Sequence, residues 1–154
     1  MNPSSKDDRG RPPAGPINQM RQTLFYRLPW IGFCILIFRQ SSAPSPLDTF
    51  SLFPHEDKVM HFLAYGILAV LTARNMAGER PHWSPWAIGI FAVLFTTAFG
   101  LSDEIHQSFV PQRHASVLDL VADFLGACAG AWAHPRLCLR FPWMGPETPK
   151  IHHP

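Results

Sequence analysis

Four apolar runs divide the chain between two polar ends. The runs cover approximately residues 23–38, 59–73, 83–101 and 117–133. A helix that crosses a hydrocarbon core about 30 Å thick needs about 20 residues, so each run is at the short end of the range. Polar residues such as Asp57 and Lys58 can continue a helix beyond its apolar run. The pattern predicts an all-α integral membrane bundle of four transmembrane helices.

The last apolar run carries two acids and two glycines on one helical stripe. At about 100° per residue these side chains fall within an arc of roughly 60°. They are Asp119, Asp123, Gly126 and Gly130. The opposite side holds bulky apolar residues, and bulky residues face lipid whereas small and polar ones face protein. We therefore expect the stripe to point inward, with the glycine pair forming a helix-packing groove or an oligomer contact.

Composition supports a membrane domain flanked by polar tails. The chain has 154 residues, 47% of them hydrophobic and only 16% charged, whereas soluble proteins average about 25% charged. Residues 1–22 and 134–154 are rich in proline and polar groups, so we interpret them as flexible tails around a domain at 23–133. The net charge of +2 is too small to indicate a nucleic-acid partner.

The distribution of cations predicts the orientation. Ten of the 13 Lys and Arg residues lie in the N-terminal region, the second connection and the C-terminal end. Because cytoplasmic segments are enriched in Lys and Arg, both termini are predicted to be cytoplasmic. Trp83, Trp86 and Trp132 then lie at the cytoplasmic interface, where aromatic rings are favoured.

This orientation places most of the unusual polar residues on or just inside the outer face. They are Asp57, Lys58, His61, Tyr65, Asp103, Glu104, His106, Gln107, Arg113, Asp119 and Asp123. Ionisable residues within membrane segments usually face protein or a water-filled cavity. We predict that these residues line an outward-facing, ligand-binding polar pocket.

Two segments carry a family resemblance. DKVMHFLAYGILA and SDEIHQSFVPQRHASVLDLVADFLGA resemble the two signature blocks of the VanZ-like membrane proteins, over roughly residues 57–132. The resemblance implies a small multi-span protein of the bacterial inner membrane connected with the cell envelope, and its namesake is associated with low-level resistance to the glycopeptide teicoplanin. It does not imply a known reaction. Asp123 departs from the family pattern, which more often has Asn at this position.

The acids of the last run have different explanations. Ser116 and Asp119 have the spacing of a capping box, in which Asp119 would satisfy free N–H groups of the first turn. Asp123 lies one turn deeper, where an unpaired charge costs on the order of 3 kcal/mol. We expect Arg113, His61 or His106 to be its partner.

The other polar groups allow a structural explanation beside a functional one. His61 alone is compatible with a hydrogen-bonded core histidine. The residues from Asp103 to Gln107 are compatible with a solvated helix end, although two acids, an imidazole and an amide beside a span favour a site. Within that group, Asp103, Glu104 and His106 are candidate catalytic residues.

Metal and cofactor motifs are weak or absent. His61 and His106, with Asp103 or Glu104, offer ligands that zinc accepts, but no compact ligand motif is present, so we predict no metal site. The sequence contains no P-loop and no GxGxxG motif, so no cofactor is predicted.

Three functions are compatible with these observations. The favoured one is a non-enzymatic protein that binds a lipid-linked envelope precursor or a lipophilic glycopeptide among membrane lipids. The second is a membrane-embedded hydrolase or transferase that uses Asp103 or Glu104 as a general base. The third is a purely structural role, in which the polar face only holds the helices together.

Overall fold

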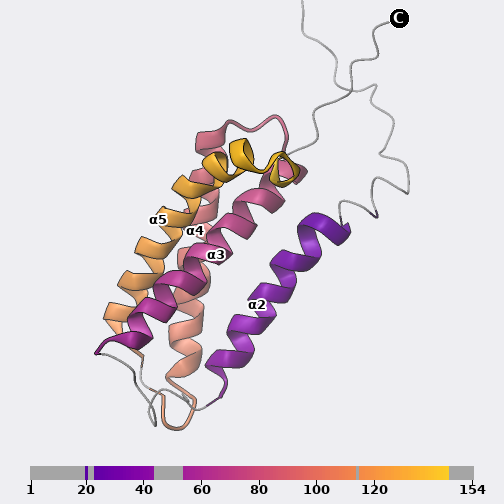
Figure 1. The fold of residues 1–154 in the computed structure, drawn as a ribbon. Coiled ribbons are helices and arrows are strands. Elements are labelled where there is room, and N and C mark those ends of the chain that lie inside the picture. The colour runs from indigo at the N-terminus through magenta and orange to yellow at the C-terminus, as the bar shows by residue number, and fades with distance from the viewer. Residues whose placement is uncertain (1–19, 21–22, 44–53, 114, 146–154) are drawn as a thin grey trace, which may run out of the picture.

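The computed structural model is a bundle of helices (Figure 1). It describes residues 20, 23–43, 54–113 and 115–145. The elements are the π-helix η2 (Thr23–Arg27), the α-helices α2 (Leu28–Ser41), α3 (Glu56–Glu79), α4 (Pro85–Gln107) and α5 (Val117–Arg140), and the 3₁₀-helix η4 (Pro142–Met144). No strand occurs among the described residues, so the all-helical prediction is confirmed there. Most of the two predicted tails, at 1–19, 21–22 and 146–154, lies outside them.

Three helices are long and apolar enough to cross a membrane. These are α3, α4 and α5, with 24, 23 and 24 residues. Each is longer than its apolar run because polar residues continue the helix, as expected for Asp57 and Lys58 at the start of α3. The helix α2 has 14 residues, about 21 Å at the α-helical rise, and by itself is shorter than a hydrocarbon core.

The distribution of side chains is inverted relative to a water-soluble bundle. Large apolar residues face outward: Leu94 on α4 is 65% exposed and Leu125 on α5 is 52% exposed. Many of the buried residues are small or polar, and Thr96 and Asp123 among them are fully buried. A soluble protein places its charges outside, so this pattern fits a lipid environment.

Glycines allow α3 and α5 to cross at close range. A side chain on Gly126 would collide with the carbonyl oxygen of Phe62, and one on Gly130 with the carbonyl oxygen of Gly66. The inward direction predicted for the α5 stripe is therefore confirmed. The groove is occupied by α3 of the same chain, so it does not offer the open oligomer face considered from the sequence.

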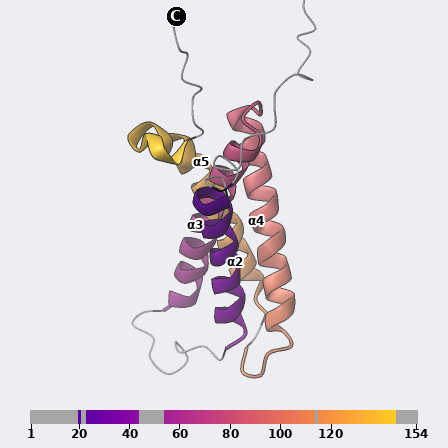
Figure 2. The same ribbon diagram turned by 90° about the vertical axis from the view of Figure 1, so that its right-hand side faces the viewer.

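The last turns of α5 bend across the end of the bundle (Figures 1 and 2). Pro135 lies inside the helix, and a proline cannot donate the hydrogen bond of its turn. The Arg136 guanidinium donates to the carbonyl oxygen of Trp132 at 2.7 Å and lies over the Trp132 ring. The helix continues to Arg140, beyond the border predicted at residue 133.

The first and last described segments meet at the same end of the bundle. The Tyr26 hydroxyl donates to the carbonyl oxygen of Gly145 at 3.1 Å, and Arg27 pairs with Glu79 at 2.6 Å. The opposite end is where α2 and α4 end and α3 and α5 begin (Figure 2). We call this opposite end, which holds Ser41 and Asp57, the polar end.

Candidate functional site

Acidic and amide side chains are buried at the polar end. The buried members of the predicted set are Tyr65, Asp103, Glu104, Gln107, Asp119 and Asp123. The solvated helix end considered for Asp103, Glu104 and Gln107 is therefore wrong, since these side chains are 4 to 5% exposed. They lie between helices, and their contacts form two groups.

The first group centres on an imidazole–carboxylate pair between α3 and α5. His61 Nδ1 and Asp123 Oδ1 are 2.9 Å apart, and Asp123 is fully buried. Gly100 on α4 makes room for this pair, because an added Cβ would lie 2.7 Å from Asp123 Oδ2. The sequence did not reveal the role of Gly100, since a glycine within an apolar run has no distinguishing signal.

Asp119 pairs with α3. Lys58 Nζ donates to Asp119 Oδ1 at 2.7 Å and to the more exposed Asp57 at 2.8 Å. The expected capping box is wrong, because Ser116 forms no side-chain cap at the start of α5. The carboxylate of Asp119 turns toward the ammonium instead, since a charged partner gives a stronger hydrogen bond than a backbone N–H.

The Glu104 carboxylate of α4 accepts a backbone hydrogen bond from the start of α5 instead. The backbone N–H of Ser116 donates to Glu104 Oε2 at 2.7 Å. The interaction is a charge-assisted hydrogen bond to an N-cap residue from a neighbouring helix. It ties the end of α4 to the beginning of α5.

The second group joins α2 to α4. The Ser41 hydroxyl donates to Asp103 Oδ2 at 2.6 Å, and Gln107 Nε2 donates to the same oxygen at 2.9 Å. Ser41 was not among the predicted site residues. Its position at the polar end of the first apolar run is the signal that would have found it.

Arg113 and His106 do not contact Asp123, so both are wrong as its expected partners. Arg113 donates to the carbonyl oxygens of Gln40 and Ala43, at 2.8 and 2.9 Å. It thereby satisfies carbonyl groups at the C-terminal end of α2. His106 Nε2 lies 3.0 Å from the Ser42 hydroxyl, on the side of α4 that faces α2.

Several buried polar atoms have no hydrogen-bond partner among the described residues. Three are carboxylate oxygens of Asp103, Glu104 and Asp123, and a fourth is the Tyr65 hydroxyl. The Tyr65 ring stacks on the His61 ring, with centroids 5.9 Å apart. His61, Glu104 and Asp123 also offer ligand atoms within 4.8 Å of one another. The pairing of His61 with His106 that was considered for a metal does not occur.

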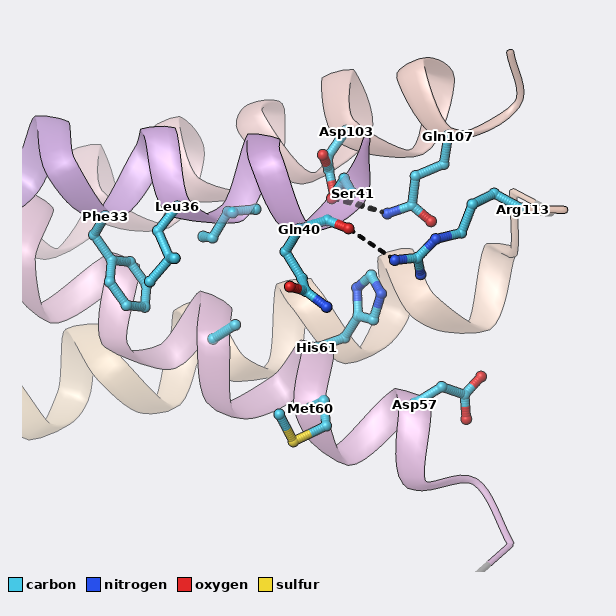
Figure 3. Close-up of a pocket in the computed structure, with 12 residues that line it drawn as sticks. Phe33, Leu36, Gln40, Ser41, Asp57, Met60, His61, Asp103, Gln107 and Arg113 are labelled. Carbon is cyan, nitrogen blue, oxygen red and sulfur yellow. Dashed lines mark hydrogen bonds between the residues drawn. The ribbon is translucent and has the colours of Figure 1, made fainter. Parts of the chain in front are cut away.

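A cavity of about 390 Å³ opens beside the first group. Its polar lining consists of Gln40, Ser41, Asp57, His61, Asp103, Gln107 and Arg113, and its apolar lining of Phe33, Leu36, Ile37, Met60 and Ala64. Figure 3 places Phe33 and Leu36 toward one side of the cavity and Gln107 and Arg113 toward the other. The predicted pocket is thus divided: five of its residues line the cavity, and the others lie around it, with Asp119 and Asp123 buried against α3.

The fold and the site define a helical protein whose apolar helices fit a membrane and whose charged groups are buried between them. The VanZ/LLP1 family model matches residues 17–138, and the chain belongs to this family. The family expected from the two sequence blocks is thereby confirmed. No curated protein and no solved structure matches the chain.

Proposed function

We propose that the protein binds a membrane amphiphile in the cavity between α2, α3 and α4. The observation that carries this proposal is the polarity gradient of the cavity. Phe33, Leu36 and Met60 offer an apolar wall for an acyl or prenyl chain, and Asp103 and Arg113 lie at the polar side. A cavity of this kind binds a ligand with one apolar and one polar part.

The head group is rich in hydrogen-bond donors. Carboxylates outnumber cations at the polar end, and Lys58 already pairs with Asp57 and Asp119. Arg113 is engaged by backbone carbonyl groups. Sugar hydroxyls and amides would donate to the remaining oxygens. Lipid-linked envelope precursors and lipophilic glycopeptides both combine such groups with an apolar chain, which connects the proposal with glycopeptide resistance.

The protein lies in the bacterial inner membrane with four spans and cytoplasmic termini. The elements η2 and α2 follow one another from Thr23 to Ser41, and together they form the fourth span. The excess of Lys and Arg on the side of both termini supports this orientation. The cavity then opens from the outer half of the membrane.

Filling the cavity tests the proposal. The variant Ala64→Phe places a ring in the lining, and Ala98→Phe, on the exposed side of α4, is the matched control. We expect a photoactivatable lipid-linked sugar or lipoglycopeptide in nanodiscs to label α2 and α3 of the wild type. Labelling should fall at least about tenfold in Ala64→Phe, the loss of about 1.4 kcal/mol of binding free energy, and remain unchanged in Ala98→Phe. Equal labelling of all three proteins would contradict the proposal.

One observation favours a hydrolase or transferase as the second candidate. His61 lines the cavity while the buried Asp123 holds its imidazole, an arrangement typical of a general base. The sequence-based candidates Asp103 and Glu104 instead accept hydrogen bonds from Ser41 and Ser116. Turnover of a bound lipid-linked substrate that is lost in His61→Gln would identify an enzyme, whereas binding without turnover would identify a binding protein.

A further inference from the structure

We propose that His61, Glu104 and Asp123 form a binding site for a divalent transition-metal ion. The three residues come from α3, α4 and α5, and their ligand atoms lie within 4.8 Å of one another. An ion with ligands at about 2.0 to 2.2 Å holds them about 3 to 4 Å apart, so small side-chain rotations complete the convergence. No motif marks such a site in the sequence, because each helix contributes one ligand.

Unpartnered buried oxygens point independently to a ligand. Asp123 is fully buried and its Oδ2 atom has no hydrogen-bond partner among the described residues, while Oδ1 contacts His61. The Oε1 atom of Glu104 is likewise buried and unpartnered, since Ser116 contacts only Oε2. Buried acceptors of this kind cost about 1 to 3 kcal/mol each when nothing binds them. A cation satisfies them.

The charge balance of the polar end also favours a cation. Its acids are Glu56, Asp57, Asp103, Glu104, Asp119 and Asp123, and its full cations are Arg39, Lys58 and Arg113. Lys58 pairs with Asp57 and Asp119, whereas Arg113 contacts the end of α2. Within the described part of the chain, Asp123 pairs with the His61 imidazole and Glu104 forms no ion pair with a Lys or Arg. A divalent ion offsets their two charges in a site from which water is largely excluded.

The ligand set indicates the class of metal. One imidazole nitrogen with two carboxylates suits Zn²⁺ or Mn²⁺, whereas Mg²⁺ and Ca²⁺ prefer oxygen ligands alone. Three protein ligands leave a coordination position open. Because His61 also lines the cavity, an ion beside it would add a site for an anionic oxygen, such as a phosphate oxygen. The metal site does not depend on the proposed amphiphile binding.

The test is metal binding by the full-length protein purified in detergent with no lipid substrate. After chelation and dialysis, wild-type protein is titrated with Zn²⁺ and Mn²⁺ by calorimetry, and its metal content and thermal unfolding midpoint are measured. We expect one equivalent of ion to bind and to raise the midpoint. The nearly isosteric variants Glu104→Gln and Asp123→Asn should each weaken binding at least about tenfold.

Two controls separate this site from adventitious binding. His106→Gln removes an imidazole that contacts Ser42 outside the cluster, and a His152→Ala/His153→Ala double variant removes the adjacent histidines near the C-terminus. Both controls should bind like the wild type. Failure of folded wild-type protein to bind either ion would overturn the proposal, as would binding that is lost in the double variant but kept in Glu104→Gln. Neither result would affect lipid labelling, so the two proposals fail separately.

Discussion

Gly100 shows how one small residue permits a buried charged pair. An added Cβ would lie 2.7 Å from Asp123 Oδ2 and 3.1 Å from Tyr65 Cε1, both of them side-chain atoms. We expect Gly100→Ala to destabilise the protein by about 1 to 3 kcal/mol, because these two side chains must shift to relieve the overlap. The midpoint of thermal unfolding in detergent measures the effect.

Gly89 provides the matched control on the same helix. A Cβ added there meets nothing within 4 Å. Gly89→Ala should therefore leave the stability unchanged or raise it by up to about 1 kcal/mol, because alanine favours the helix. Equal midpoints for the two variants would show that the space at Gly100 is not needed.

The chemistry of individual residues could be predicted from the sequence more easily than their partners. The depth of Asp123 in its apolar run indicates that it needs a partner, and His61 is one of the three partners expected from the sequence. The choice among His61, His106 and Arg113 depends on helix rotation and on the path of the α4–α5 connection. Neither is encoded in a spacing along one helix, because a contact between helices also depends on their crossing.

At the scale of helices, the crossing of α3 and α5 depends on glycine. Gly126 and Gly130 bring the α5 backbone against Phe62 and Gly66. We expect Gly126→Ala to be more harmful than Gly100→Ala, with a loss of about 3 kcal/mol or more, since the opposing atoms are backbone and cannot rotate away. Folded yield after gel filtration and the unfolding midpoint are the measurements. Gly32→Ala on α2 is the control, because nothing lies within 4 Å of an added Cβ there.

Helical periodicity explains why the elements were predicted well. The α5 stripe follows from a repeat of 3.6 residues, and its buried acids and exposed Leu118 and Phe124 agree with it. The ends of the helices were predicted less well. The polar segment from residue 134 was expected to lie outside the last helix, but α5 continues through Pro135 to Arg140. The short α2 was also not apparent, since η2 and α2 form one apolar run in the sequence.

At the scale of the whole molecule, the buried charges connect the helices at one end. Lys58 and His61 connect α3 to α5, Glu104 connects α4 to α5, and Asp103 connects α4 to α2. Each helix near the polar end is thus held to at least one other by a hydrogen bond. Such bonds are favoured in lipid because water does not compete for the same groups. The arrangement therefore combines stabilisation of the bundle with a set of functional groups.

The orientation of this polar end in the membrane is the prediction on which an envelope ligand depends. Phe109, 81% exposed in the α4–α5 connection, and His82, in the α3–α4 connection at the opposite end, are suitable reporter positions. With Cys34, Cys128 and Cys138 replaced by serine, Phe109→Cys should react with a membrane-impermeant maleimide in intact cells. His82→Cys should react only after permeabilisation, because cation-rich connections stay in the cytoplasm. The reverse pattern would place the cavity on the cytoplasmic side and exclude extracellular glycopeptides as ligands. Labelling of both positions in intact cells would contradict the placement of the α3–α4 connection in the cytoplasm.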